Sequence, residues 1–338
     1  MKPSDFSYHL TRYLTDYLAG QRNSSRNTLL AYRDTFKLFL IFCKTEKGIQ
    51  PERLTLSKIS DMLIKEYYDW LEKTRGCSPI SRNNRRTAIN SFFKYVQIEA
   101  PEHLLLCQRI LSIPKKHCVK PVIGYLTPDM LKLLLSMPDK ANTYERRELV
   151  LMTVLYDTGA RVQELCDLRV RDLRLESPAI ATLTGKGRKT RHVPLMKNTV
   201  SLLRRYLEDQ RIENRSGCDR PLFMNRHHTA YTRKGIAYIL EKYEKRAREV
   251  SLLLPDFAIS PHIFRHSKAM HLYQAGIDLI YIRDILGHVD IATTEVYARV
   301  DTERKRDALE NAYPEITSST LADWNDDEDL IRKLSRLV

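Results

Sequence analysis

Six side chains between residues 161 and 297 have the types and order needed to break a phosphodiester without a metal ion. A phosphodiester carries one negative charge, and more charge builds up on its oxygens when a nucleophile attacks, so a metal-free site must supply fixed cations and hydrogen-bond donors. Two arginines, two histidines, a lysine and a tyrosine make such a set, namely Arg161, Lys186, His262, Arg265, His288 and Tyr297.

Two of the arginines are candidates for holding the phosphate. A planar guanidinium can donate to two non-bridging oxygens at once and stays charged at neutral pH. Arg161 follows the sequence TGA, which predicts a tight turn and a helix start where backbone N–H groups point outward. Arg265 lies three residues after His262, on the same face of a predicted helix. Both arginines could contact one phosphate if the fold brings the two helix starts together.

Tyr297 is the candidate nucleophile. A free tyrosine has a pKa of about 10, so only about one in a thousand is ionised at neutral pH, and it needs a base and nearby positive charge. His262 is the candidate base, His288 can donate to a non-bridging oxygen, and Lys186, in the turn TGKGRKTR, could protonate the leaving oxygen as general acid. Glu164 either orients an arginine or a histidine or is an ordinary helix carboxylate.

The composition points to a polyanionic partner. The 338-residue chain has 56 lysines and arginines against 42 aspartates and glutamates, which gives a formal net charge of +14. Such an excess is typical of nucleic-acid-binding proteins, although other basic proteins share it. The length suffices for two domains with separate cores.

Other features argue against secretion, membrane insertion and a metal or disulfide scaffold. The N-terminus MKPSDFSYHL lacks the pattern of a signal peptide, and the longest apolar run, near residues 38–43, is too short to span a bilayer. The six cysteines are scattered without a C-x-x-C pair. We therefore expect reduced thiols, no metal, no membrane partner and a cytoplasmic location.

The first part of the chain is predicted to be helical. Apolar residues recur at helical spacing over about residues 5–19, in a second helix capped by Ser24 or Ser25, and over about 57–74 and 79–98. The fourth helix begins with a cationic, amide-bearing face that suits a DNA groove, because arginine contacts phosphate or guanine and asparagine can read adenine. A solvated helix surface is the alternative. The candidate DNA contacts are Arg82, Asn83, Arg85 and Arg86.

A basic, proline-rich stretch over about residues 100–124 is predicted to be extended. Its later part, residues 111–124, would be an interdomain linker that could lie along a DNA backbone and includes the candidate contacts Lys115 and Lys116. Thr127 and Pro128 then predict the capped first turn of a second domain.

The second domain is predicted to be mostly helical with one β-hairpin. Residues 180–183 and 190–195 flank the sequence GKGRK, which predicts a hairpin with a basic tip. Helices are expected at about 197–211, 232–249, 262–274, 278–286 and 290–300. Further DNA contacts are predicted for Arg188, Arg233 and Lys234. The tail, from about residue 313, should end in a short amphipathic helix whose apolar stripe is Leu330, Ile331, Leu334 and Leu337.

These motifs resemble those of the tyrosine site-specific recombinases of the phage-integrase and Xer-like family. The first arginine lies in TGARVQELCDL, the lysine in TGKGRKTRHVPL and the His-x-x-Arg pair in HIFRHSKAMHL, while LGHVDIATTEVYARV supplies the second histidine and the tyrosine. All six positions that the family uses hold its usual residue types, and the motifs cover about residues 125–300.

The resemblance implies a mainly α fold in two domains. Residues 1–110 would be a four-helix, SAM-like core-binding domain, and residues 125–312 an α+β catalytic domain with a small sheet. The helix of the tail, residues 313–338, would pack into a neighbouring subunit, with packing on its own domain as the alternative.

The resemblance also implies site-specific recombination. Tyr297 would attack the scissile phosphate to give a 3′-phosphotyrosine and a free 5′-hydroxyl, which conserves the bond energy, so that no ATP, metal or other cofactor is required. Two rounds of strand exchange would pass through a Holliday junction in a homotetramer on two DNA duplexes. Short inverted-repeat core sites are the expected target, a mobile element the expected source, and an accessory protein or partner recombinase a further partner.

Three other activities compete with this interpretation. A type IB topoisomerase performs the same cleavage but rejoins the same strand, and the four-helix first domain and the tail favour recombination. A DNA-binding regulator without catalysis would not need six catalytic residue types in order. A metal-dependent nuclease would need clustered carboxylates at the site, whereas the acidic cluster here, residues 326–329, lies in the tail.

Overall fold

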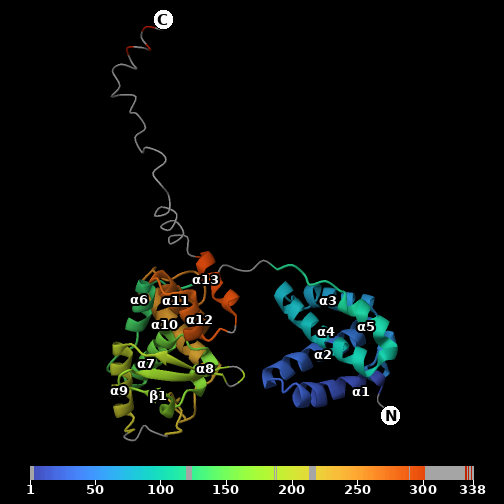
Figure 1. Ribbon diagram of the computed structural model, residues 1–338, viewed down its shortest axis with the longest axis horizontal. Helices are drawn as coiled ribbons and strands as arrows, with labels where there is room; N and C mark the ends of the chain where they lie inside the picture. The colour runs from blue at the N-terminus through green and yellow to red at the C-terminus, as the bar shows by residue number, and fades with distance from the viewer. Residues whose placement is uncertain are drawn as a thin grey trace. The chain divides into compact units, whose positions relative to one another are not determined.

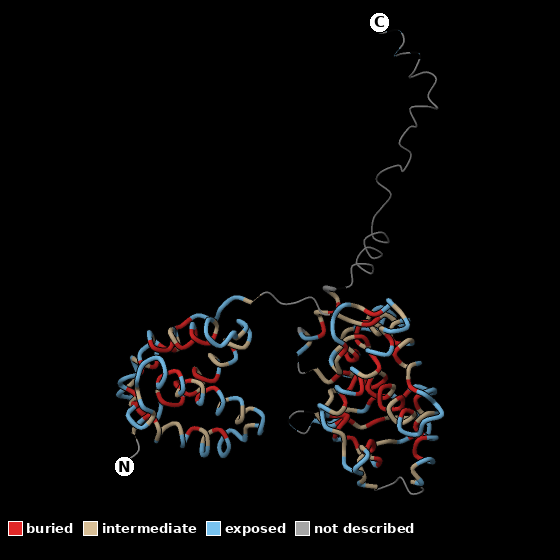
Figure 2. The backbone as a smooth tube through the Cα atoms, turned by 180° about the vertical axis from the view of Figure 1, so that it is seen from behind, coloured by how far each residue is buried: buried red, intermediate tan, exposed pale blue. Residues whose placement is uncertain are grey.

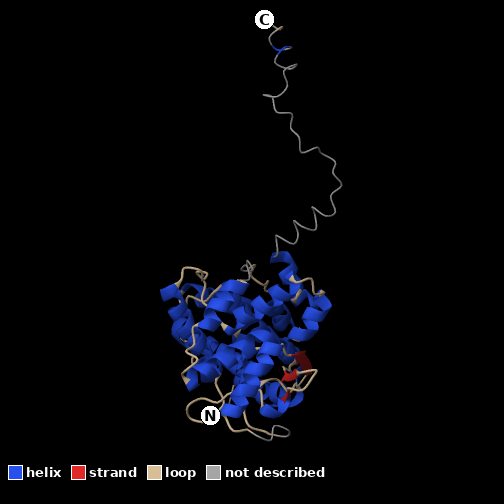
Figure 3. Cartoon of the chain, turned by 90° about the vertical axis from the view of Figure 1, so that its left-hand side faces the viewer, coloured by secondary structure: helices blue, strands red, loops and turns tan. Residues whose placement is uncertain are grey.

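The chain folds into two compact units, residues 1–121 and 122–338. The computed structural model describes residues 4–118, 124–185, 187, 189–212, 218–288 and 290–300, together with residues 332, 334 and 336. Helices make up most of both units, and the strands form one small sheet in the second (Figures 1 and 3). The predicted mainly α fold with a small sheet in its second part is therefore confirmed.

The N-terminal unit contains five α-helices and one π-helical segment among its described residues. These are α1 (Asp5–Arg12), η1 (Tyr13–Gln21), α2 (Arg26–Lys47), α3 (Asp61–Lys73), α4 (Pro79–Glu99) and α5 (Leu104–Leu111). Ser25, one of the two predicted caps, caps α2 by accepting from the Thr28 N–H, and left-handed Gly48 ends the helix. The predicted first helix, over about residues 5–19, becomes a π-helix at Tyr13 and ends at Gln21.

An aromatic core holds these helices together. Phe6, Phe36 and Phe92 are at most 2% exposed, and their rings meet edge to face with centroids 5.1 to 5.6 Å apart. Tyr13 and Tyr67 are fully buried in the same cluster. Figure 2 shows these buried segments facing one another inside the unit.

The stretch that follows α4 differs from its prediction. Residues 104–111 form α5 instead of an extended chain, because Cys107 and Ile110 bury their side chains against the aromatic core. The N-terminal unit is thus a five-helix rather than a four-helix domain. Prolines and lysines on either side of the short apolar run LLLCQRIL, such as Pro101, Pro114 and Lys115, favour the prediction of an extended chain.

The second unit consists of eight helices around one small sheet in its described part. The helices are α6 (Pro128–Ser136), α7 (Thr143–Thr158), α8 (Val162–Asp167), α9 (Lys197–Asp209), α10 (Arg233–Val250), α11 (Pro261–Gln274), α12 (Leu279–Leu286) and α13 (Glu295–Val300). Thr127 caps α6, with Pro128 in its first turn, as predicted.

The antiparallel sheet has the order β1-β2-β3, with strands β1 (Leu173–Arg174), β2 (Ile180–Thr184) and β3 (Thr190–Pro194). The predicted hairpin is β2–β3, in which Leu183 pairs with Arg191. Side chains alternate along both strands, so Ala181, Leu183 and Val193 enter the core of the second unit.

Some expectations concern features that the chain should lack. Within the described ranges, no helix is long and apolar enough to cross a membrane, and no three His, Cys, Asp or Glu side chains form a metal-binding group. All six cysteines are free thiols. Of the predicted tail stripe, Leu330, Ile331 and Leu337 lie outside the described residues; Leu334 is helical and 53% exposed.

Candidate active site

The C-terminal ends of α7 and α12 meet at the centre of the candidate site. Each helix ends at a left-handed glycine, Gly159 with φ 56° and Gly287 with φ 66°. A Cβ atom on Gly159 would lie 2.7 Å from a side-chain carbon of Leu286, and one on Gly287 would lie 2.9 Å from Cδ of Arg191. Both positions therefore require glycine for backbone conformation and for space.

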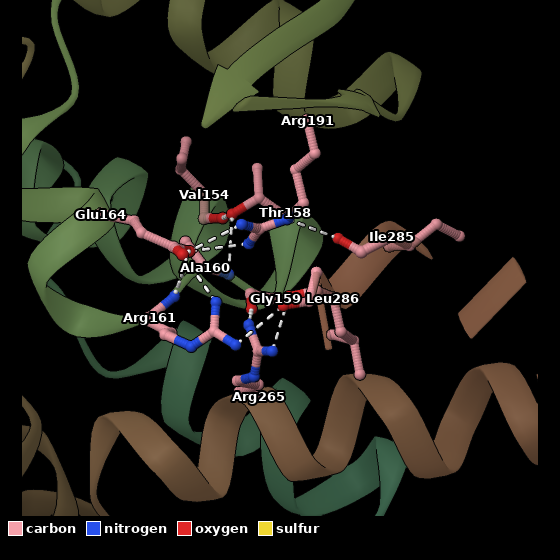
Figure 4. A network of polar contacts seen from close by, with 11 residues as sticks. Val154, Thr158, Gly159, Ala160, Arg161, Glu164, Arg191, Arg265, Ile285 and Leu286 are labelled. Atoms are coloured by element: carbon pink, nitrogen blue, oxygen red, sulfur yellow. Dashed lines mark hydrogen bonds and ion pairs between the residues drawn. The ribbon is translucent and has the colours of Figure 1, made fainter. Parts of the chain in front are cut away.

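The two predicted phosphate-binding arginines donate to backbone oxygens at these helix ends (Figure 4). Arg265, on α11, donates to the Gly159 oxygen at 2.7 Å and to the Leu286 oxygen at 2.6 Å. Arg161, at the start of α8, donates to the Gly287 oxygen at 2.9 Å. Helix C-termini carry partial negative charge, so both cations occupy favourable positions. The structure thus brings together two arginines that are 104 positions apart in the numbering of the chain.

Glu164 lies between Arg161 and a third arginine, Arg191, which the sequence analysis did not single out. Its carboxylate accepts from the Arg161 backbone N–H and Nη1, both at 2.8 Å, and from Arg191 Nη1 and Nη2 at 3.0 and 2.7 Å. Arg191 also donates from Nε to the Ile285 oxygen at 2.8 Å. Of the two interpretations of Glu164, the structure therefore favours the one in which it orients arginines.

The ionisation of these groups is fixed before any ligand arrives. Burial, followed by the charges of Arg161 and Arg191, lowers the pKa of Arg265 to about 10, so Arg265 stays cationic at neutral pH. Burial opposes the ionisation of Glu164, but hydrogen bonds from Arg191 and Arg161 outweigh it and lower the pKa to about 2. Three arginines and one carboxylate leave an excess of positive charge, which favours a ligand that gains negative charge.

Tyr297, on α13, lies in a small apolar cluster beside these cations. Its ring packs with Met270 and Ile282, and the residue is 1% exposed. Burial raises the pKa of its hydroxyl, and the charge of Arg265 opposes that rise. The hydroxyl oxygen lies 2.9 Å from Nδ1 of His266 on α11. The predicted nucleophile is therefore within the field of a predicted phosphate-binding arginine.

The histidines of this region occupy different positions around Tyr297. His266 contacts the tyrosine, although it is not among the residues predicted from the sequence. The only signal for it in the sequence is its position directly after the second arginine in HIFRHS. His262, the predicted base, is exposed, and its ring centroid lies 6.4 Å from that of His266. His288 Nδ1 lies 2.9 Å from Thr294 Oγ1. Burial, with the charges of the arginines, lowers the pKa of His288 to about 4.

Lys186 and Arg188, at the hairpin tip, lie outside the described residues, so their roles stay predictions. The described base of the hairpin adjoins the arginine cluster. Its Gly185 N–H donates to the Lys189 oxygen at 2.8 Å, and a Cβ atom on Gly185 would lie 3.0 Å from Glu164 Oε1. The described base of the hairpin therefore lies at the edge of the candidate site.

Several candidate DNA contacts on α4 are engaged within the N-terminal unit. Asn83 is 5% exposed; its amide nitrogen donates to the Lys116 oxygen at 2.8 Å, and its oxygen accepts from the Lys116 N–H at 3.1 Å. Arg86 donates to the Ile113 oxygen at 2.7 Å, and Arg82 lies over a buried tyrosine ring. The buried amide of Asn83 therefore holds the chain that leaves the unit, and a contact of Asn83 with DNA stays a prediction.

The other candidate DNA contacts remain accessible. Arg85 is half-buried, whereas the remaining four are exposed: Lys115, Lys116, Arg233 and Lys234. The Lys116 ammonium also pairs with Glu72 at 2.7 Å. Contacts of these side chains with DNA stay predictions.

The sequence matches known families over both units. Residues 10–99 match the phage integrase N-terminal SAM-like domain, and residues 124–304 match the phage integrase family. The chain belongs to the phage integrase family of tyrosine recombinases. It is therefore a DNA breaking-and-rejoining enzyme. The predicted SAM-like first domain and recombinase catalytic domain are confirmed.

This tyrosine recombinase is similar over most of its length to proteins that are named as recombinases. The putative integrase/recombinase y4rC of Sinorhizobium fredii is 34% identical over 328 residues, which cover 97% of each chain. Tyrosine recombinase XerD of Listeria monocytogenes is 32% identical over 302 residues, 88% of this chain and 96% of that protein.

Solved structures share the fold of this recombinase. The XerH site-specific recombinase bound to a palindromic difH substrate has a TM-score of 0.65 and 23% identity, with coverage of 88% of this chain and 83% of that one. The Tn1549 transposon integrase in complex with transposon right-end DNA has a TM-score of 0.69 and 17% identity, with coverage of 89% and 98%.

Proposed function

We propose that this tyrosine recombinase cuts and rejoins duplex DNA at short inverted-repeat core sites through a 3′-phosphotyrosine on Tyr297. The observation that carries the proposal is that Arg265 binds the ends of α7 and α12, and Arg161 binds the end of α12, beside that tyrosine. Arg265 uses two of its five N–H donors there, and the Arg161 side chain is 35% exposed. Donors of both arginines can therefore turn to a bound phosphate.

We infer the strand-transfer step from these positions and from the roles that the sequence predicts. The Tyr297 hydroxyl loses its proton to a histidine base, predicted as His262, and its oxygen attacks the phosphorus; the bond to the 5′ oxygen breaks, and both arginines neutralise the charge that builds up on the non-bridging oxygens. His288 donates to the same oxygens, and Lys186 supplies the proton to the leaving 5′ oxygen. The phosphotyrosine keeps the bond energy, so a 5′-hydroxyl of the partner strand can reverse the step without ATP, metal or another cofactor.

Duplex DNA is the proposed substrate and partner. The chain carries a formal net charge of +14, and Lys115, Arg233 and Lys234 are exposed. The matched XerH and Tn1549 integrase structures are complexes with DNA. Binding through phosphate contacts should weaken steeply as salt rises, because each neutralised phosphate releases counterions.

We propose further that two core sites are joined in a homotetramer, which exchanges strands through a Holliday junction, with an accessory protein or partner recombinase as an additional participant. The tail helix would pack into a neighbouring subunit through Leu330, Ile331, Leu334 and Leu337. Replacing these four residues with serine preserves chain length and charge. Single-site DNA binding should persist while tetramers disappear in mass photometry. Unchanged tetramers would instead assign the helix to its own domain.

Covalent trapping tests the proposed chemistry. Nicked duplexes from the DNA that flanks the gene would be incubated with the protein in EDTA and resolved on a denaturing gel. The expected result is an EDTA-resistant adduct that is lost in Tyr297→Phe and kept in Tyr281→Phe, a control at a 66% exposed tyrosine of α12. Strand exchange between two labelled duplexes then separates recombination from topoisomerase activity. Tight binding without an adduct would indicate a regulator and contradict the proposal.

A further inference from the structure

The hydroxyl of Tyr297 has a hydrogen-bond partner that the proposed scheme does not use. Nδ1 of His266 lies 2.9 Å from the tyrosine oxygen, and the two ring centroids are 5.8 Å apart. The imidazole comes from α11 and the phenol from α13, so the fold, rather than chain proximity, brings them together. A group that touches the attacking oxygen is placed to receive its proton.

The neighbouring histidines do not make this contact in the described part of the chain. His262 lies one helical turn before His266 and is exposed. His288 directs its Nδ1 to the Thr294 hydroxyl at 2.9 Å, and that threonine is fully buried. Among the described histidines, His266 is therefore the one that contacts the nucleophile, whereas His262, the base predicted from the sequence, does not.

His266 is also in the protonation state that a base needs. Burial, followed by the charges of His262 and Arg265, lowers its pKa to about 4. The imidazole is therefore neutral at pH 7, and the tautomer with its proton on Nε2 leaves the Nδ1 lone pair facing the phenol. Nδ1 of His266 therefore accepts the hydrogen bond that the Tyr297 hydroxyl donates.

We propose that His266 is a catalytic base that removes the proton of Tyr297 as that residue attacks DNA. This inference rests on the proposed role of Tyr297 as nucleophile. The O–H bond of Tyr297 breaks, its proton moves to Nδ1 of His266, and the freed electron pair forms the bond to phosphorus. The bond between phosphorus and the 5′ oxygen breaks, and that oxygen takes a proton from the lysine ammonium of Lys186. Religation returns the proton from the imidazolium to the departing tyrosine.

Substrate binding would itself favour this transfer. In the free protein burial, followed by the charges of His262 and Arg265, disfavours an imidazolium at His266, and burial also raises the pKa of Tyr297, so Tyr297 stays a phenol. A phosphodiester bound between the arginines brings a negative charge that offsets this field and stabilises the imidazolium. The tyrosine would then become nucleophilic only when a phosphate is in place, which protects the free enzyme from unproductive reactions.

The test is the pH profile of adduct formation by His266→Asn in the full-length protein. Asparagine can still accept the tyrosine hydrogen bond but cannot take up a proton. His271→Asn is the matched control, because His271 lies on the same helix and contacts a different tyrosine hydroxyl, that of Tyr156, at 2.8 Å. The probe is a nicked duplex, made both with the normal 5′ oxygen and with sulfur in its place, at saturating protein and pH 6.5–8.5.

The expected loss of rate in His266→Asn is at least about a hundredfold at pH 7, with DNA binding unchanged. Its rate should then rise about tenfold per pH unit, since the phenol must ionise unaided, whereas the wild type and His271→Asn stay nearly flat. The charged and titratable groups around His266 and Tyr297 are Arg265 and His262 on α11, together with Arg161, Glu164, Arg191 and His288. Both variants keep all of these groups, so a difference in the slope of the pH profile is due to the residue at position 266.

The substrate with sulfur in place of the 5′ oxygen distinguishes the loss of a catalytic base from the loss of a catalytic acid. A thiolate leaves without a proton, so sulfur should restore activity to Lys186→Ala but not to His266→Asn. Full activity of His266→Asn at pH 7 would reduce His266 to a positioning residue and overturn the proposal, as would its rescue by sulfur. Absence of an adduct in the wild type itself would overturn the nucleophile assignment and this inference with it.

Discussion

Replacing Glu164 with glutamine should destabilise the second unit by about 3 kcal/mol at neutral pH. The Glu164 side chain is 3% exposed and accepts four hydrogen bonds from Arg161 and Arg191. Its pKa falls from an ordinary 4.5 to about 2, and each unit corresponds to about 1.4 kcal/mol. Loss of one partner from a buried ion pair typically costs about 3–5 kcal/mol, which agrees with this magnitude.

The pH dependence of this loss has a defined sign. Because the folded-state pKa of Glu164 is depressed, its contribution is complete above the unfolded pKa of about 4.5 and disappears as the pH falls through about 2. By the same relation, the difference between wild type and Glu164→Gln should shrink to about 1 kcal/mol at pH 3.

Calorimetry of the full chain would measure the effect. For a unit of this size, about 3 kcal/mol corresponds to a decrease in Tm of about 6–12 °C in the transition of the second unit. Glu249→Gln, at an exposed glutamate of α10, serves as the control and should change Tm by less than about 2 °C. Equal shifts in the two variants at pH 7, or a Glu164→Gln effect that persists at pH 3, would refute the reasoning from an ionised carboxylate.

Three further variants test other contacts. Arg265→Lys loses the planar fork that binds two backbone oxygens, so adduct formation should fall at least about a hundredfold while DNA binding persists. Asn83→Ala removes both hydrogen bonds between the side-chain amide and Lys116, and should lower the free energy of unfolding of the N-terminal unit by about 1–3 kcal/mol in denaturant titration. Thr294→Val deprives His288 of its hydroxyl partner and should lower the adduct rate about tenfold, with altered imidazole ¹⁵N shifts.

Surface variants provide the comparisons for these three. Arg283→Lys, on the outer part of α12, should leave adduct formation unchanged, and Asn84→Ala, at an exposed position beside Asn83, should leave stability unchanged. An Arg265→Lys protein that cleaves like the wild type would contradict the proposed role of Arg265 in binding the phosphate. Equal stability of Asn83→Ala and Asn84→Ala would show that the amide does not hold the linker.

Local chemistry made much of the fold predictable. Ser25, Thr127 and Pro128 act within one helical turn, so their capping roles can be read from neighbouring residues. The β2–β3 hairpin has the same character, because alternation and a glycine-rich turn are short-range signals. Helix α5 is not predicted because its stability comes from burial against distant aromatic residues, and the prolines that flank it indicate an extended chain.

The site was predictable in its residue types but not in its contacts. The motifs identify Arg161, Arg265 and Tyr297, whereas Arg191 and His266 become visible only when β3, α11 and α13 are placed together. The contacts of Asn83 are also not evident from the sequence, since this polar residue on a cationic helix face is buried by the chain segment that crosses it. Such crossings depend on tertiary structure and leave no periodic signal.

The arginines are anchored mostly by main-chain oxygens, and this has a consequence for how the sequence can vary. The oxygens of Ile285, Leu286 and Gly287 belong to the backbone, so replacing the side chains at 285 and 286 leaves the acceptors in place. Insertion or deletion of one residue there would instead move every acceptor out of register. Directed evolution of this enzyme should therefore tolerate substitution of the half-buried Ile285 more readily than a change in the length of the α12 terminus, where packing also constrains the buried Leu286 and the left-handed Gly287.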